Sequence, residues 1–239
     1  RDTGEHAIVD HQLVANIGVA LGLINRLVIY AGLPINLMMT GEDVMGVPAA
    51  DGSTIGDLYL GLRVRIWGES DDFFALAFQG TVTAPTADAA HEGQAYAGER
   101  NFTGHTELTA EIRPGPVRIT ANVGARFREA ADFQTIETGH DLTWGLGLSG
   151  MVHPMVELLG EVYGSSMFAS FADRGSSPIE AIAGVRLHPG LGFVIGLAGG
   201  AGLSRGAGSP AARAVLTFGW AMPEREDEPE PEPEIGDTD

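Results

Sequence analysis

Apolar and polar residues alternate with a period of two along most of this 239-residue chain. In the segment 58–66, LYLGLRVRI, one face carries leucine, valine and isoleucine, while the other carries tyrosine, glycine and arginine. The segments 117–128, VRITANVGARFR, and 179–188, IEAIAGVRLH, divide in the same way. A helix would spread these charges around its circumference, whereas a strand keeps them on one side. The pattern therefore predicts β-strands.

The same test predicts about eleven strands. We expect them near residues 11–23, 26–38, 55–67, 73–84, 103–113, 116–128, 140–151, 155–164, 178–188, 191–203 and 210–221. Most are longer than the five or six residues that are usual for a strand in a soluble protein. A tilted strand needs about 9–11 residues to cross a bilayer. The strand lengths favour an antiparallel up-and-down transmembrane β-barrel.

The connections between these strands alternate between short and long. The short ones lie at 24–25, 68–72, 114–115, 152–154 and 189–190, and most contain Gly, Pro, Asn or Asp. The long ones lie at 39–54, 85–102, 129–139, 165–177 and 204–209. Bacterial outer-membrane barrels have short periplasmic turns and longer extracellular loops. The connections therefore point to the same fold.

Each face of the predicted strands has an expected role. The apolar face should meet lipid, and we assign to it Leu58, Leu60, Leu62, Val64, Val117, Ile119, Val123, Leu146, Val185 and Leu216. Aromatic residues near the strand ends should form the girdles at the two membrane interfaces, and these are Phe74, Phe218 and Trp220 at the short-turn end and Phe127 and Trp144 at the long-loop end. Trp67 is an exception, because its parity points inward.

The polar face should line the lumen. Its predicted members are Tyr59, Arg63, Arg65, Glu107, Glu111, Arg118, Asn122, Arg126, Glu157, Glu161, Glu180, Arg186 and Arg213. Charges of both signs allow two interpretations. They line a hydrated pore and bias its ion selectivity, or arginine and glutamate pair across the lumen and plug it. The balanced charges favour the second interpretation, and single-channel conductance would separate the two.

Composition excludes several other classes of protein. The chain contains no cysteine, so disulfides and thiolate metal sites are impossible. A formal charge of −18 disfavours binding to nucleic acid. No apolar run approaches the roughly 20 residues of a membrane helix; the uncharged stretch 27–40, for example, contains Gly32, Pro34 and Asn36.

Candidate catalytic residues are few. His140 and Asp141 lie at the long-loop end, but neighbours on a strand point to opposite faces. His105 and Ser149 have no identifiable orienting partner, and His6 and His11 are separate from the other histidines. No glycine-rich motif follows a strand and opens a helix. We therefore expect no enzymatic activity, no metal and no cofactor.

Three regions are expected along the chain: an N-terminal segment over 1–10, a barrel over 11–222 and a disordered linker over 223–239, PEREDEPEPEPEIGDTD. The first visible turn is short, so the first strand must run down from outside. Bacterial single-chain barrels have even strand numbers. We therefore expect a twelfth strand before Arg1 in the natural protein, and a mature N-terminus at Arg1 would exclude it.

The stretches VDHQLVANIGVALGLINRLVIYAGLPINL, GDLYLGLRVRI, VTAPT, ITANVGARFR and SPIEAIAGVRLHPGLG resemble the N-terminal barrel of myxobacterial-type multidomain OmpA-family proteins. The C-terminal stretch AGGAGLSRGAGSPAARAVLTFGWA extends this resemblance, which covers residues 9 to about 222. In that family a Pro/Glu-rich linker leads to Asp-rich calcium-binding repeats, whose start Asp237 and Asp239 resemble, and then to a peptidoglycan-binding domain that is not in this chain. The final strand RAVLTFGW resembles the signal recognised by the barrel-assembly machinery, although Val215 stands where glycine is preferred.

Three functions follow as alternatives. The first expectation is a structural barrel in a Gram-negative outer membrane that anchors a periplasmic region, with its C-terminal tail in the periplasm. Its partners would be membrane lipid, lipopolysaccharide and the barrel-assembly machinery, with peptidoglycan reached only through the absent domain. The second is a porin-like channel for small solutes or ions. The third is a soluble β-barrel that binds a ligand.

Overall fold

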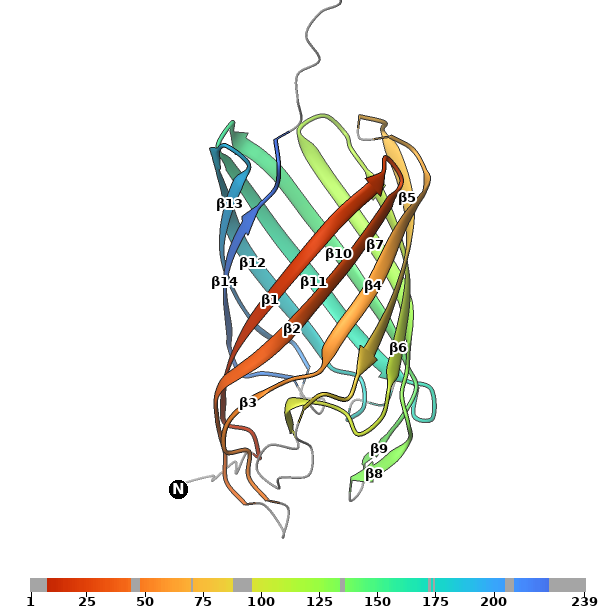
Figure 1. Ribbon diagram of the computed structural model, residues 1–239, viewed down its shortest axis with the longest axis vertical. Coiled ribbons are helices and arrows are strands. Elements are labelled where there is room, and N and C mark those ends of the chain that lie inside the picture. The colour runs from red at the N-terminus through yellow and green to blue at the C-terminus, as the bar shows by residue number, and fades with distance from the viewer. Residues whose placement is uncertain are drawn as a thin grey trace, which may run out of the picture.

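The computed structural model describes residues 8–43, 48–69, 71–87, 96–133, 136–171, 173, 175–204 and 209–223. These residues form an all-β, antiparallel up-and-down barrel (Figure 1). Its strand order is β1-β2-β4-β5-β6-β7-β10-β11-β12-β13-β14, so each long strand pairs with its neighbours along the chain. Within the described ranges, no helix is long and apolar enough to cross a bilayer.

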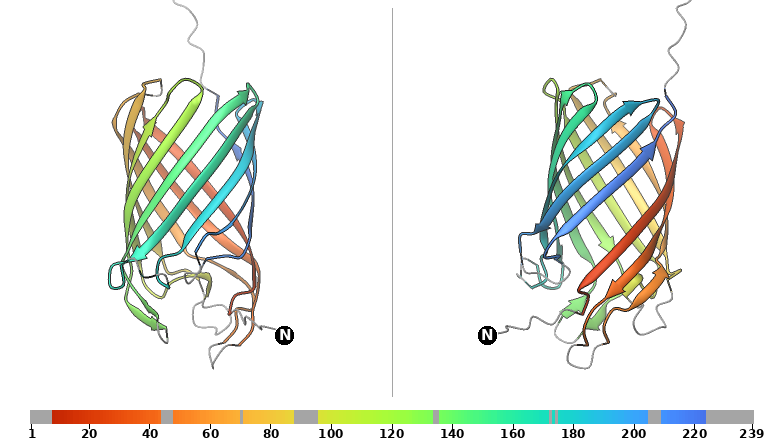
Figure 2. Two further views of the ribbon diagram at one scale, coloured as in Figure 1. Left: turned by 180° about the vertical axis from the view of Figure 1, so that it is seen from behind. Right: turned by 90° about the vertical axis from the view of Figure 1, so that its left-hand side faces the viewer.

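The eleven long strands wind around the barrel at a tilt (Figures 1 and 2). They are β1 (His11–Ile24), β2 (Leu27–Thr40), β4 (Leu58–Trp67), β5 (Phe74–Ala84), β6 (Thr103–Ile112), β7 (Val117–Phe127), β10 (Asp141–His153), β11 (Val156–Met167), β12 (Ile179–Gly190), β13 (Phe193–Gly202) and β14 (Arg213–Trp220). Every strand predicted from the alternating pattern is confirmed, with both ends within three residues of the prediction.

Three short strands lie in segments that were predicted to be loops. β3 (Gly52–Ile55) pairs with β2, and β8 (Ala131–Phe133) forms a separate hairpin with β9 (Ile136–Thr138). The short turns gather at one end of the barrel, the top in Figure 1, and the long connections gather at the other. The two ends are called the short-turn end and the mouth below.

The turn after β12 differs most from its prediction. A turn was expected at 189–190, but β12 continues to Gly190 and the reversal is made by Leu191 and Gly192. Both have positive φ, 52° and 80°. A β-carbon on Gly192 would lie 1.8 Å from the carbonyl oxygen of Ala221. Backbone packing against the end of β14 therefore fixes this turn.

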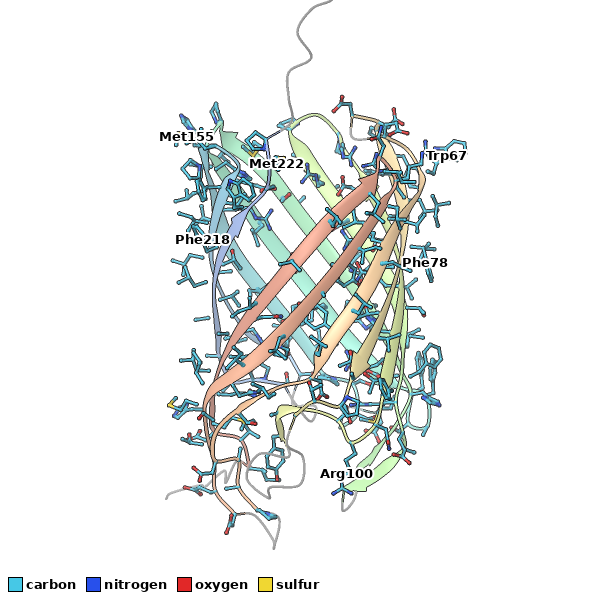
Figure 3. The ribbon with its side chains drawn as sticks, viewed as in Figure 1. Trp67, Phe78, Arg100, Met155, Phe218 and Met222 are labelled. Carbon is cyan, nitrogen blue, oxygen red and sulfur yellow. The ribbon has the colours of Figure 1, made fainter. Side chains whose placement is uncertain are left out.

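The side chain of Trp67 lies on the opposite face of the sheet from the one that its parity predicted. The ladder between β4 and β5 shifts between Arg65 and Trp67, so that Trp67 pairs with Leu76. Such a bulge inserts one residue and reverses the alternation beyond it. Trp67 therefore points away from the barrel at the short-turn end (Figure 3), and its residue is 66% exposed. The inward assignment is wrong, and Trp67 joins the aromatic residues on the outside.

The apolar face of the sheet looks outward, and the described residues form no apolar core inside the barrel. Met39 and Ala50 are the only buried hydrophobic residues in the described part of the chain. Leu60 and Leu146 are 58% exposed, and Leu216 is 77% exposed. A soluble sandwich would bury such residues against a second sheet, which is not the arrangement found. The outward apolar face is that of a membrane-spanning barrel.

The sheet has two edges, β1 and β14. Both strands run toward the short-turn end and lie beside each other in the second view of Figure 2. No ladder joins them among the described residues. The expected twelfth strand stays a prediction.

Candidate functional site: the lumen

The residues predicted to line the lumen share the inward face of the sheet, where they contact other polar side chains or border the cavities described below. Arg63 donates from Nε and Nη2 to Oε1 of Gln79, at 2.9 and 2.6 Å. Arg213 donates from Nε to Oε2 of Glu180 at 2.9 Å. Such contacts join strands that are adjacent or one apart in the sheet. They therefore run along the wall.

Water reaches most of the inward-facing charges. The side chains of Arg118, Arg126 and Arg213 are 50%, 43% and 43% exposed, and Glu161 is also exposed. Side chains that filled the lumen would bury one another, as in a protein core. Their exposure shows that the lumen is not packed solid.

Two tyrosines lie along the wall. Tyr30 reaches across Gly61 to Thr81, with 2.5 Å between the two hydroxyl oxygens. Tyr59 reaches across Gly32 and donates to Oδ1 of Asn16 at 3.2 Å. A β-carbon on either glycine would lie 2.2 Å from the tyrosine above it. The glycines therefore let both rings lie against the wall, which leaves the lumen wider.

A dense network of charges occupies the short-turn end. We call it the short-turn belt; its members are Arg26, Arg65, Glu69, Glu111, Arg113, Arg118, Glu157, Arg186 and His188. Glu69 accepts from Arg26 at 2.5 Å and from Arg65 at 2.9 Å. Glu111 lies 2.5 Å from Arg113 and 3.3 Å from Arg118. Each of these carboxylates thus has at least two cationic neighbours.

Glu157 is the most buried carboxylate of the belt, with 5% exposure. Arg186 donates to it at 2.9 Å, and His188 lies 3.3 Å away. Arg118 is at 4.0 Å. Glu157 therefore joins β7, β11 and β12 at this end of the lumen.

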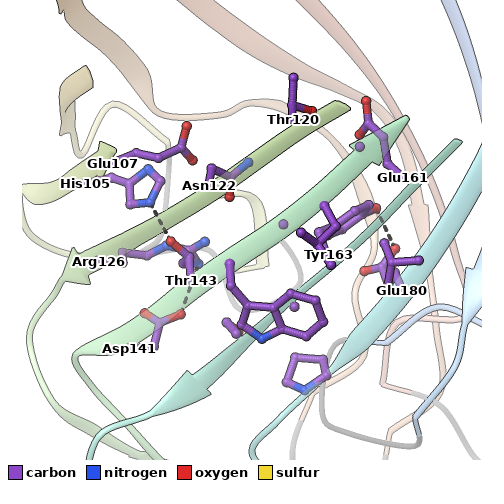
Figure 4. Close-up of a pocket in the computed structure, with 18 of the residues that line it drawn as sticks. His105, Glu107, Thr120, Asn122, Arg126, Asp141, Thr143, Glu161, Tyr163 and Glu180 are labelled. Carbon is purple, nitrogen blue, oxygen red and sulfur yellow. Dashed lines mark hydrogen bonds and ion pairs between the residues drawn. The ribbon is translucent and has the colours of Figure 1, made fainter. Parts of the chain in front are cut away.

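A hollow of about 560 Å³ lies in the wall nearer the mouth (Figure 4). We call it the outer hollow. The residues that matter for its chemistry are His105, Glu107, Asn122, Arg126, Arg128, Asp141, Thr143, Glu161, Tyr163 and Glu180. They come from β6, β7, β10, β11 and β12, together with the residue that follows β7. Sequence alternation placed five of them in the lumen but gave no sign that they share one cavity.

Some polar side chains of the outer hollow already have hydrogen-bond partners. Glu180 accepts from Tyr163 at 2.9 Å as well as from Arg213. His105 and Thr143 are joined by a 2.9 Å hydrogen bond that passes over Gly124. The remaining charges of the hollow are less well paired, and they are considered below.

A tethered segment crosses the mouth. We call residues 96–101 the mouth segment. Asp57, which directly precedes β4, accepts from the backbone N–H of Glu99 at 2.6 Å and from those of Thr86 and Ala87 at 3.1 and 3.0 Å. Arg128, which directly follows β7, lies 3.2 Å from the Glu99 carboxylate. In the sheet, β5 and β6 lie between the strands that carry Asp57 and Arg128. Through Glu99, the mouth segment therefore links β4 to β7 across part of the mouth.

Tyr96 fixes the start of the mouth segment. Burial, together with the negative charge of Asp43, raises the pKa of the Tyr96 phenol. Its hydroxyl donates to the carbonyl oxygen of Pro48 at 2.5 Å. The segment is therefore tied to the loop after β2 as well as to β4 and β7.

The predicted lipid-facing residues lie on the outward face of their strands, opposite the charges. Among the aromatic residues, Phe218 is 72% exposed and Phe193 packs beside it, with ring centroids 5.8 Å apart. Trp220 donates from its indole to the carbonyl of Leu191 at 3.1 Å. Trp144 lies across Gly164 at the mouth. Phe74 and Phe127 are also exposed, at 39% and 47%.

The residues weighed as catalytic candidates do not form a catalytic set in the described structure. His140 packs edge-on against Phe127, with ring centroids 5.7 Å apart, while Asp141 is buried in the inner wall. Ser149 lies at the short-turn end in a smaller cavity with Glu157 and His188. His6, Asp237, Asp239 and the Pro/Glu linker beyond Pro223 lie outside the described residues.

Several residues of the lumen were missed from sequence. Arg113 and Arg128 lie just past the ends of β6 and β7, and Glu69 lies in a turn. Asp57 precedes a strand, and nothing in its neighbourhood marks it as an anchor. The alternation in the segment 117–128 already placed Arg128 on the polar face, but it could not find the turn and loop residues.

The barrel-shaped sheet, its outward apolar face and its charged interior are those of an outer-membrane β-barrel. The NanC porin has a similar structure, with a TM-score of 0.63 at 6% sequence identity, over 89% of this chain and 95% of that one. A search of curated proteins finds no match. A family profile described as "Putative MetA-pathway of phenol degradation" matches residues 13–177. The chain belongs to that family.

Proposed function

We propose that the protein is a passive outer-membrane channel for small polar and charged solutes. The exposure of the inward-facing arginines carries this proposal. A plug requires charges that meet across the lumen and exclude water, whereas the pairs here run along the wall and the guanidinium groups stay wet. A water-filled interior lined by both signs of charge is typical of a porin.

The family description names phenol degradation, so passage of aromatic compounds is a second candidate. The three tyrosines of the inner wall, Tyr30, Tyr59 and Tyr163, are its support. Each directs its hydroxyl to a polar partner, however, and the wall between them is charged. Polar solutes therefore suit this lumen better than phenol.

The anchoring role is retained as an additional proposal. The resemblance to multidomain OmpA-family barrels and the acidic residues beyond Pro223 support it. A barrel can conduct and anchor at the same time, so the two roles do not compete. We also propose that the barrel acts without catalysis and that its partners are lipid, lipopolysaccharide and, during biogenesis, the barrel-assembly machinery.

Single-channel recording tests the channel directly. The full chain, refolded in detergent and inserted into a planar bilayer, should give discrete conductance steps in KCl. Ala198→Phe places a ring on the inner wall beside Gly184 and should lower the step size. Leu197→Phe, one residue away on the outward face, is the matched control and should not. Absence of steps from correctly folded protein would refute the channel.

A further inference from the structure

The inner wall of the lumen is not polar throughout. By the alternation of their strands, Leu159 of β11 and Ile182 of β12 point inward, on the same face as Glu161. No other leucine or isoleucine on the described long strands from β5 to β14 has this parity. Both side chains are partly exposed. Because apolar surface in contact with water is unfavourable, an apolar group of a solute would be stabilised against these two residues.

The strand register brings the two apolar residues next to one carboxylate. Glu161 pairs directly with Ile182, and Leu159 pairs with Gly184. Opposed residues on neighbouring strands have β-carbons about 4.5–5.5 Å apart, and residues two apart along one strand lie about 7 Å apart. A β-carbon on Gly184 would lie 2.5 Å from that of Ala198 on β13, so the apolar surface continues across this glycine. We call Leu159, Ile182 and Ala198 the inner apolar patch.

Glu161 gives the inner apolar patch an unpaired charge at its edge. It is exposed and takes part in no hydrogen bond or ion pair among the described residues. In the outer hollow it lies at the end away from Asp141 (Figure 4). Its neighbours across the sheet toward β7 are Gly147 and Thr120, which carry no charge. The carboxylate is therefore accessible to a positively charged group of a solute.

The carboxylates on either side of Glu161 already have arginine partners. Glu157, four residues away on β11, accepts from Arg186 at 2.9 Å. Glu180, near the start of β12, accepts from Arg213 at 2.9 Å. The inner apolar patch therefore has one unpaired carboxylate beside it, which suits a solute with a single positive charge.

We infer that this part of the lumen binds organic ammonium ions that carry one positive charge and a compact hydrocarbon body, such as benzylammonium. The ammonium group lies by Glu161, and the hydrocarbon lies against Leu159 and Ile182, which are close enough for one small molecule to contact all three. An inorganic cation would leave the inner apolar patch in water, and a neutral aromatic molecule would leave Glu161 unpaired. The inference rests on the proposed function, since the solute must enter a water-filled lumen.

Methyl NMR on the full chain in detergent micelles measures binding without any current. Benzylammonium should shift the methyl signals of Ile182, which Ile182→Val identifies by their loss. The methyl signals of Ile195, on the outward face, should stay in place, and they control for uptake of the amine by the micelle.

Three probes divide the affinity into its two parts. Benzylammonium should bind at least about tenfold more tightly than methylammonium, measured by competition, because it also covers apolar surface. It should bind about threefold more tightly than benzyl alcohol at low salt, because it also meets a carboxylate. This second difference should vanish at about 1 M salt.

Two variants assign the contacts. Glu161→Gln should weaken binding of benzylammonium about threefold and leave that of benzyl alcohol unchanged. Leu159→Ala should weaken binding of both, by about threefold or more. Leu158→Ala, the neighbour on the outward face with 50% exposure, is the matched control and should change neither.

Equal affinity for benzylammonium and benzyl alcohol at low salt, equal shifts at Ile182 and Ile195, or unchanged binding in both variants would overturn the inference. In a planar bilayer, benzylammonium should also reduce the KCl current, because it occupies the lumen. Binding without conductance steps would refute the channel and leave the site intact. Steps without binding would refute the site and leave the channel intact.

Discussion

The two ends of the lumen use the same residue types in different ways. In the short-turn belt, Glu69, Glu111 and Glu157 each lie within 4.0 Å of two arginine side chains. In the outer hollow, Asp141 and Glu180 also pair with arginines, but Glu107 and Glu161 lie without such neighbours among the described residues. Paired charges fix the wall, and unpaired charges remain available to a solute. We therefore expect the belt to stabilise the barrel, and the unpaired carboxylates of the hollow to remain accessible to solutes.

The largest effect on stability should come from placing a charge on the lipid-facing side of the sheet. Leu62→Arg puts a charge on the lipid face near the middle of β4 and should lower the free energy of unfolding by about 2–4 kcal/mol. Arg63→Leu, its inward neighbour, should change conductance with little loss of stability. Urea titration of the folded barrel in lipid vesicles measures both. Equal tolerance at the two positions would mean that the faces are assigned wrongly.

The second effect compares the belt with the hollow directly. Glu157→Gln removes the charge that Arg186 and His188 contact, and should cost roughly 2 kcal/mol of unfolding free energy, as charged hydrogen bonds do. Glu161→Gln should change it by less than about 0.5 kcal/mol, since the side chain is exposed and unpaired. The same urea titration checks this. A similar loss of unfolding free energy in both variants would mean that the paired charges of the belt are no more important for stability than the unpaired charges of the hollow.

A third effect concerns the mouth. Asp57→Ala leaves three backbone N–H groups without their acceptor and should release the mouth segment at a cost of about 1–2 kcal/mol. We expect larger conductance steps and faster cleavage near residues 96–101 by an added protease. Asp51→Ala, at an exposed position before β3, is the control. An unchanged step size would show that the mouth segment does not restrict flow.

The smallest effect should be on ion selectivity. The free carboxylates of the hollow should favour cations, and Glu161→Gln should lower the cation-to-anion permeability ratio by about two- to threefold at low salt. Raising the salt to about 1 M should remove the difference, because the Debye length falls to about 3 Å. Reversal potentials in a KCl gradient give the ratio. A preference for anions in the unaltered protein would contradict the assignment.

The alternating pattern predicted the strands well because a sheet between lipid and water needs opposite faces along its whole length. Trp67 was misplaced because a bulge reverses parity locally, and no residue type near Ile66 marks it. The turn after β12 was misplaced by two residues because Leu191 adopts a positive φ that is rare for leucine. Alternation also found most lumen residues. It could not show which charges pair, since pairing depends on strand stagger and side-chain reach.

The seam between β1 and β14 has a consequence for assembly. β1 is 14 residues long and β14 is 8, and the facing backbone groups of both lack ladder partners in the described structure. Unsatisfied backbone groups are costly in hydrocarbon. Because the two edges point the same way, one strand of opposite direction would hydrogen-bond to both. A synthetic peptide with alternating apolar and small residues should therefore insert between β1 and β14 as an added strand. By hydrogen bonding to both edges, it would close the barrel.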